Sequence, residues 1–168
     1  LLFSSCQEED PVSDNCSSNQ EFNNSRGDCT ESLSLSSTYN ESISGTNRVI
    51  SCNSIPSHLV GLFGGGQGSL NPTAIAAQSE TYTVATNPSE ANNWTPLLGD
   101  NGPDYSFGIV LNGVELDPVA AEPFPHEGIM APNVNWEWNL EALNVRIGLD
   151  CNAAHVQPTG KYHYHGVP

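Results

Sequence analysis

Twelve prolines and fifteen glycines are spread along the 168 residues of this chain. Proline has no backbone N–H to donate within a helix, and glycine loses the most conformational freedom when a helix forms, so both interrupt helices. The polarity comes mainly from Ser, Asn, Thr and Gln, because only 14% of the residues are charged. The sequence therefore predicts a mostly β fold, β-sandwich-like or α+β with a few short helices, in which long ordered loops join the strands.

Three segments in the first half of the chain have the pattern of β-strands. Residues 33–36 alternate apolar and polar side chains, which is the period of a half-buried strand. Residues 48–52 and 81–86 are rich in β-branched side chains, and each is followed by a turn signal. We expect all three segments to be strands.

A hairpin and two short helices are expected further along. Residues 107–111 run into Asn112-Gly113, a favoured two-residue hairpin turn, so residues 114–116 are expected to form the partner strand. Asp117-Pro118 opens a segment that favours one helical turn over 117–122, since proline is well placed at the first helical position. Residues 136–143 form the second helix prediction.

The chain begins with a short apolar run, two small residues and a cysteine, Leu1-Leu2-Phe3-Ser4-Ser5-Cys6. This pattern resembles the end of a lipoprotein signal peptide, in which Cys6 would be the lipidated residue. We therefore expect an exported protein that is held at the outer membrane or cell surface through a lipid. Residues 7–31 are polar and are expected to form a tether, which leaves 32–168 as one domain.

Four cysteines remain once the lipidation candidate is set aside: Cys16, Cys29, Cys52 and Cys151. An even set in an exported protein predicts disulfides, and four cysteines allow three connectivities. We favour Cys16–Cys29, which closes a short polar loop, together with Cys52–Cys151, which joins the two parts of the chain that carry histidines. The CxxC spacing of zinc and redox sites does not occur in the sequence.

The charge balance excludes one class of partner. Four basic and nineteen acidic residues give a formal net charge of −15. Nucleic acids are bound through Lys and Arg, so we expect no nucleic-acid partner. Electrostatic adhesion to an anionic membrane is excluded for the same reason, which leaves the lipid as the expected attachment.

The strongest local signal is the run Gly160-Lys161-Tyr162-His163-Tyr164-His165-Gly166 near the end of the chain. Side chains alternate between the faces of a strand, so His163 and His165 share one face and Tyr162 and Tyr164 share the other. Two imidazoles at this spacing can converge on one metal ion, and neutral imidazole suits Zn, Cu, Ni or Fe. The alternative is a structural sheet edge without a ligand.

Further metal candidates lie upstream of this run. His155 and Asp150 are close in sequence, and the turn at 157–160 favours folding His155 back toward the histidine pair. His58 joins the candidates only if the Cys52–Cys151 disulfide brings it near His155. The predicted metal ligands are therefore His155, His163 and His165, with His58 and Asp150 as second candidates.

Other motifs fail to complete a known site. His126-Glu127 begins like a zinc protease motif, but HExxH is not completed, and a solvated loop is the better interpretation. Residues 63–68 are glycine-rich without the GK[ST] ending of a phosphate loop, and the chain has no GxSxG elbow. Trp136 and Trp138 are spaced to share a strand face, where packing in the core is favoured over stacking on a sugar.

Three blocks of the sequence, at 48–58, 107–118 and 149–168, resemble the YHYH domain of exported bacterial proteins. The third block contains the Tyr162-His163-Tyr164-His165 run itself. The resemblance extends from about residue 46 to the end of the chain and implies an exported domain. It implies no particular activity, so the metal prediction rests on the spacing and chemistry of the residues.

Three functions remain open from the sequence. The favoured one is an exported, lipid-anchored domain that binds a transition metal, most readily Zn or Cu, through its C-terminal histidines. The second is a non-catalytic adhesion or ligand-binding module in which the His–Tyr strand is structural. The third is a metal-dependent hydrolase with Asp150 or Glu127 as the base.

Overall fold

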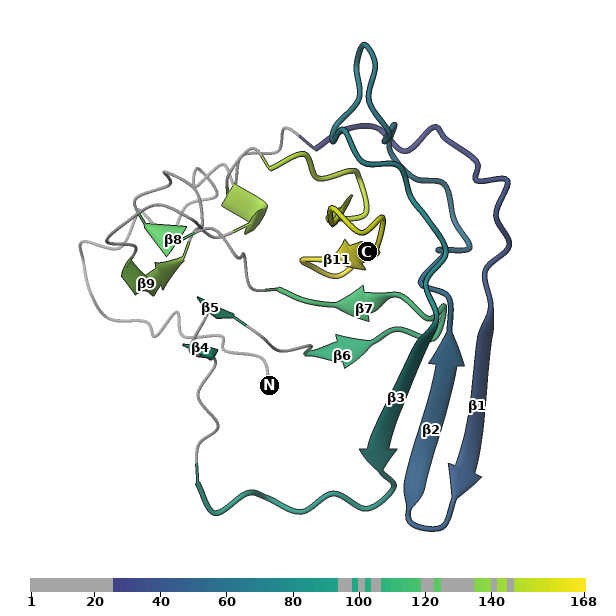
Figure 1. The fold of residues 1–168 in the computed structure, drawn as a ribbon, viewed down its shortest axis with the longest axis vertical. Coiled ribbons are helices and arrows are strands. Elements are labelled where there is room, and N and C mark those ends of the chain that lie inside the picture. The colour runs from purple at the N-terminus through teal and green to yellow at the C-terminus, as the bar shows by residue number, and fades with distance from the viewer. Residues whose placement is uncertain are drawn as a thin grey trace, which may run out of the picture.

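The computed structural model describes residues 26–93, 98–99, 102–103, 107–118, 123–124, 135–139, 142–144 and 147–168 (Figure 1). In chain order the strands are β1 (Tyr39–Ser44), β2 (Asn47–Cys52), β3 (Glu80–Ala85), β4 (Leu98–Gly99), β5 (Gly102–Pro103), β6 (Gly108–Ile109), β7 (Glu115–Leu116), β8 (Pro123–Phe124), β9 (Asn135–Asn139), β10 (Ala154–Val156) and β11 (Tyr162–Tyr164). Within these residues the helical content is one 3-10 turn, η1 (Ala142–Asn144). The predicted mostly β fold with long loops and a disulfide is confirmed.

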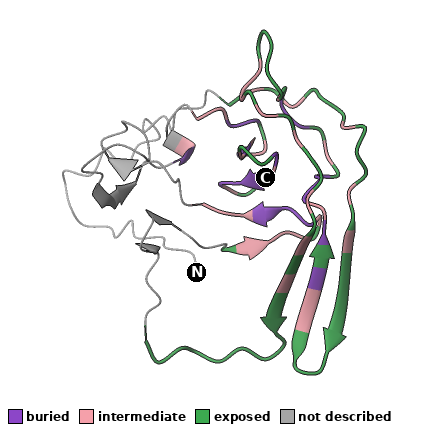
Figure 2. Cartoon of the chain, in the orientation of Figure 1, coloured by how far each residue is buried: buried purple, intermediate pink, exposed green. Residues whose placement is uncertain are grey.

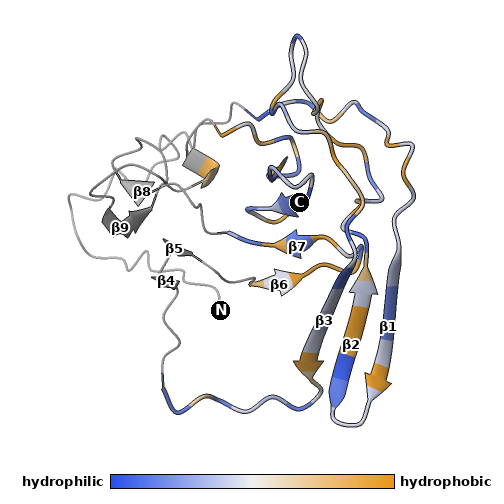
Figure 3. Cartoon of the chain, viewed as in Figure 1, coloured by the Kyte–Doolittle hydropathy of each residue, from blue (hydrophilic) through white to orange (hydrophobic). Residues whose placement is uncertain are grey.

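The first sheet is the antiparallel meander β1-β2-β3, whose strands are the longest in the described part of the chain. Its β2 and β3 confirm the strands expected at 48–52 and 81–86. One end of β2 is buried, where Ile50 and Cys52 are 4% and 6% exposed, while the outer parts of all three strands face solvent (Figure 2). Apolar Ile43 and Val84 remain exposed there, and the far ends of β1 and β3 are correspondingly orange in Figure 3. The sheet is therefore packed at one end only.

The second sheet has the strand order β10-β11-β7-β6 and contains the core. β6 and β7 form the predicted hairpin, in which Asn112 and Gly113 lie in the turn and Gly113 has a φ of +81°. β7 then pairs in parallel with β11, and β11 pairs antiparallel with β10. The buried core of this sheet consists of Val60, Val114, Ala154, Val156, Tyr162 and Tyr164. Two tyrosines of the C-terminal run are thus core residues.

Two of the expected elements are wrong. Residues 33–36 form no strand, because no other strand in the described part of the chain pairs with them. The backbone oxygen of Ser36 instead accepts a hydrogen bond from the side-chain Nδ2 of Asn53 over 2.8 Å. The expected helix over 136–143 is instead the strand β9 followed by η1, because alternating tryptophans favour an extended chain. Asp117 and Pro118 are not helical, and the rest of the turn expected over 117–122 lies outside the described residues.

The expected disulfide pairing is also wrong. The bond joins Cys29 to Cys151, which are 122 residues apart, and Cys52 is a buried free thiol. The reason is a parallel bridge between Gly27 and Asp150, which brings the two bonded cysteines side by side. Residues 26–31, expected at the end of the tether, therefore belong to the folded body. Cys16, the lipidation candidate Cys6 and residues 7–25 lie outside the described part of the chain.

Candidate metal centre

A tight hairpin places the three principal histidines. Gly160, with a φ of +86°, closes the turn between β10 and β11 by donating its N–H to the Gln157 oxygen over 2.8 Å. The register of the hairpin sets His155 directly opposite His163. His165 follows two residues later on the same face. The expected folding back of His155 toward the pair is confirmed.

The Nε2 atoms of the three rings converge. His163 Nε2 lies 3.0 Å from His165 Nε2, which lies 3.1 Å from His155 Nε2. One ligand atom from each ring falls within 4.8 Å of the others, so the group could hold a metal ion. Nitrogens that bind one Zn²⁺ at about 2.0–2.1 Å are roughly 2.9–3.4 Å apart when the angle at the metal is about 90–110°. The two short separations fall within this range.

The hydrogen bond at the outer side of His155 fixes its tautomer. The Ile147 oxygen lies 3.1 Å from His155 Nδ1 and can only accept, so Nδ1 carries the proton of the neutral ring and Nε2 presents a lone pair. His165 Nε2 contacts the Nε2 atoms of both other rings but carries at most one proton, so it can donate in only one of these two contacts. If His165 Nε2 carries no proton, its lone pair points at the lone pair of His155 Nε2. A metal cation at this position would remove the conflict, because it would accept the lone pairs of all three rings.

Burial keeps two of the rings neutral. His163 and His165 are 3% and 4% exposed. Burial, with the neighbouring His155 and His165, lowers the pKa of His163 to about 2. Burial and His155 lower the pKa of His165 to about 4. Backbone groups of Lys161 and Pro118 oppose these shifts, although neither Nδ1 atom has a hydrogen bond of good geometry among the described residues. Neutral imidazole is the form that binds metal ions.

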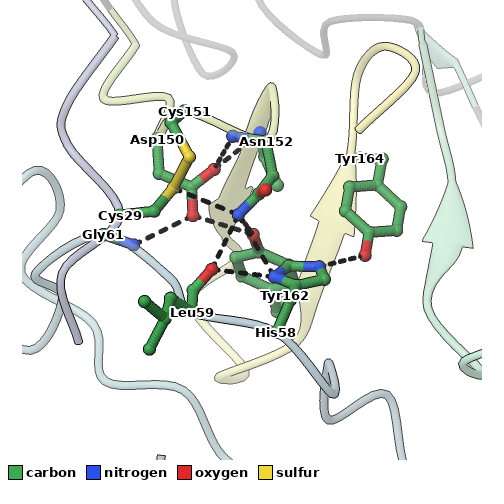
Figure 4. Close-up of a disulfide and its surroundings, with 10 residues drawn as sticks. Cys29, His58, Leu59, Gly61, Asp150, Cys151, Asn152, Tyr162 and Tyr164 are labelled. Atoms are coloured by element: carbon green, nitrogen blue, oxygen red, sulfur yellow. Dashed lines mark hydrogen bonds between the residues drawn. A yellow bond between two sulfur atoms is a disulfide. The ribbon is translucent and has the colours of Figure 1, made fainter. Parts of the chain in front are cut away.

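The tyrosines of the same strand point to the opposite face, as the alternation predicted. On that face Tyr164 is hydrogen-bonded to His58, whose Nε2 lies 2.6 Å from the tyrosine hydroxyl (Figure 4). His58 Nδ1 faces the Leu59 oxygen at 2.8 Å, so the proton is on Nδ1 and the Tyr164 hydroxyl donates to Nε2. Asn112 Nδ2 donates to the same hydroxyl over 2.8 Å. The side chain of His58 therefore lies on the tyrosine face of β11 and is not part of the histidine cluster.

Asp150 is also on the tyrosine side. Tyr162 donates its hydroxyl to Asp150 Oδ2 over 2.8 Å, and burial together with the Asp150 charge raises the pKa of that tyrosine. Asn152 lies between these groups and the disulfide, with its Nδ2 at 2.9 Å from the Leu59 oxygen and 3.1 Å from Cys29 Sγ (Figure 4). The two second-rank metal candidates therefore lie apart from the three histidines. Sequence reasoning gave Asn152 no role of its own.

A half-buried charge network flanks the histidines on their own face. Lys161 Nζ contacts the carboxylate of Glu115, which is in register with His163, and lies 3.4 Å from Glu80 Oε1. Burial opposes the charge on Lys161, but the hydrogen bond and charge of Glu115 outweigh it and raise the lysine pKa. Burial and Glu115 raise the pKa of Tyr82, whose hydroxyl lies 3.4 Å from Lys161 Nζ, to about 12. No sequence motif indicated this network, in which the cation is one of only four basic residues in the chain.

A comparison with known protein families gave a match over the part of the chain that contains the three histidines. The family described as "YHYH protein" matches residues 81–168, which is more than half of the chain. The chain belongs to the YHYH family. Searches of curated proteins and of solved structures gave no match. The match includes the second and third blocks of the predicted resemblance, and the YHYH run itself forms β11 and the residue after it.

The structure ties the first block of the resemblance to the YHYH motif although this block precedes the matched residues. His58, from that block, is hydrogen-bonded to the motif's Tyr164. His126 and Glu127 lie outside the described residues, and only the backbone of the strand that carries Trp136 and Trp138 is described. A search of the described residues found no helix with the length and hydropathy needed to cross a membrane.

Proposed function

We propose that this YHYH protein is an exported, lipid-anchored domain that binds a transition metal through His155, His163 and His165. The main support is the convergence of three imidazole Nε2 atoms on the β10–β11 hairpin. The Nε2 atom of His165 lies 3.0 Å from that of His163 and 3.1 Å from that of His155. Export and lipid attachment are supported by the lipobox-like start of the sequence. The Cys29–Cys151 disulfide agrees with an oxidising compartment.

The donor set favours Zn or Cu over hard cations. Imidazole nitrogen binds Zn, Cu, Ni and Fe, whereas Mg and Ca prefer oxygen ligands. Three histidines leave at least one coordination position free in a tetrahedral site, as in zinc sites that bind water or a small ligand. Zinc and copper are therefore the first metals to test.

The decisive experiment is elemental analysis of the purified, tag-free, oxidised protein after incubation with Zn²⁺ or Cu²⁺ and removal of excess metal. We expect about one metal per chain in the wild type and almost none in His163→Ala/His165→Ala. His58→Gln is the matched control, because it changes a histidine of the opposite face, and it should retain the metal. A wild type without metal after both incubations would refute the proposal and leave the YHYH strand as a structural element of a binding module.

A further inference from the structure

Asp150 is a fully buried carboxylate that binds no cation in the described part of the protein. Its exposure is 0%, and four donors surround it. Oδ2 accepts from the Gly61 N–H at 3.0 Å and the Tyr162 hydroxyl at 2.8 Å. Oδ1 accepts from the Asn152 N–H at 2.9 Å and the Ala154 N–H at 3.3 Å. A buried charge is tolerated at such a position because every lone pair has a partner.

Two of the four donors to this carboxylate lie on β10 and β11, the strands that carry His155 and His163. Ala154 directly precedes His155 at the start of β10, and Tyr162 directly precedes His163 at the start of β11. The Gly61 N–H adds an anchor from a loop far away in sequence (Figure 4). One side chain therefore links the residues next to two of the metal candidates, from the side of the hairpin opposite to them.

We propose that Asp150 is a positioning residue that sets how closely His155 approaches His163 and His165, and thereby sets the metal affinity. This inference rests on the proposed metal-binding function. Asp150 holds the backbone at Ala154 and the side chain of Tyr162 in one hydrogen-bonded unit, so the spacing of the two strands at the metal end follows from its geometry. It does so without touching the ion.

The test compares Asp150→Asn with the wild type in a competitive Zn²⁺ titration and in the visible absorption spectrum of the Co²⁺-loaded protein. Asparagine keeps the volume but has only one acceptor oxygen, and its amide faces N–H donors. Loss of groups that orient metal ligands typically weakens binding about 10–100-fold, and we expect about tenfold with an altered Co²⁺ spectrum. Tyr162→Phe removes one donor only and is expected to weaken Zn²⁺ binding by a smaller factor, with the same direction of spectral change.

Ile50→Ala is the control for general destabilisation, because Ile50 is buried in the first sheet, outside the hydrophobic cluster that contains Ala154 and Tyr162. It should lower the melting temperature and leave Zn²⁺ affinity and the Co²⁺ spectrum unchanged. If Asp150→Asn and Tyr162→Phe lower stability while affinity and spectrum stay at wild-type values, Asp150 is only structural and the inference is overturned. If Asp150→Asn does not fold, Tyr162→Phe decides by itself. A wild type that binds no Zn²⁺ would instead refute the proposed function.

Discussion

Acidification of the metal-free protein should destabilise it well above the pH range in which carboxylates titrate. His163 and His165 have pKa values lowered to about 2 and about 4, so both stay neutral in the folded protein down to pH 5.5. In the unfolded chain their pKa returns to about 6.5, and both take up protons as the pH falls below that value. Stability is therefore fully present above pH 6.5 and is lost as the pH falls, because the unfolded state binds more protons.

The size of the effect follows from proton linkage. At pH 5.5 a histidine with an unfolded pKa of about 6.5 that cannot protonate in the folded state favours unfolding by about 1.4 kcal/mol. Two such residues give about 3 kcal/mol, a large share of the 5–15 kcal/mol typical of a domain. Carboxylates with pKa values near 4 remain ionised at pH 5.5 and contribute little to this window.

Urea denaturation at pH 7.5, 6.5 and 5.5 in EDTA measures this loss directly. The free energy of unfolding should fall by about 2–3 kcal/mol across the series, and His165→Gln should show roughly half of that decrease. A wild type whose stability changes by less than about 0.5 kcal/mol between pH 7.5 and 5.5 would refute the argument that these rings are buried in neutral form.

Three further predictions concern the fold around the site. Gly113→Ala should destabilise the protein more than Gly45→Ala in urea titrations: both glycines have positive φ, but a Cβ at 113 would lie 2.6 Å from a buried Cβ atom, whereas position 45 has nothing within 4 Å. Tyr164→Phe should cost about 1–3 kcal/mol in thermal unfolding, since a histidine and an asparagine side chain lose their shared hydroxyl, and an unchanged melting temperature would contradict that role. Cys29→Ser/Cys151→Ser should lose about 4–5 kcal/mol, and peptide mapping of the oxidised wild type that found a different bridge would contradict the pairing.

Local sequence signals predicted the strands and turns that depend on neighbouring residues. β2 and β3 follow from β-branched side chains, and the β6–β7 hairpin follows from Asn112-Gly113. Residues 33–36 have an equally regular alternation, but a strand also needs a partner strand, which local pattern does not specify. The disulfide failed for the same reason, since the neighbourhood of Cys29 and Cys151 is created by a bridge between distant segments.

The candidate site divides in the same way. The two-residue period of a strand and a turn-forming segment were enough to bring His155, His163 and His165 together. The two-residue period also placed Tyr162 and Tyr164 on the other face, but it does not indicate which residues contact them there. His58 and Asp150 were grouped with the metal candidates because of residue type and sequence distance, whereas their hydrogen bonds to Tyr164 and Tyr162 depend on tertiary structure.

The position of the disulfide determines how a mechanical load would travel through the domain. Tension applied to the segment before Cys29 passes through the sulfur–sulfur bond to Cys151, and the intervening residues are bypassed by a covalent path. All three strands of the first sheet lie in that bypassed part of the chain, so pulling would leave them unstretched. The force would instead arrive four residues before His155, next to the hairpin. Once the bridge between Gly27 and Asp150 has opened, a pull on the amino-terminal segment would therefore load the hairpin of the histidine cluster before any strand of the first sheet.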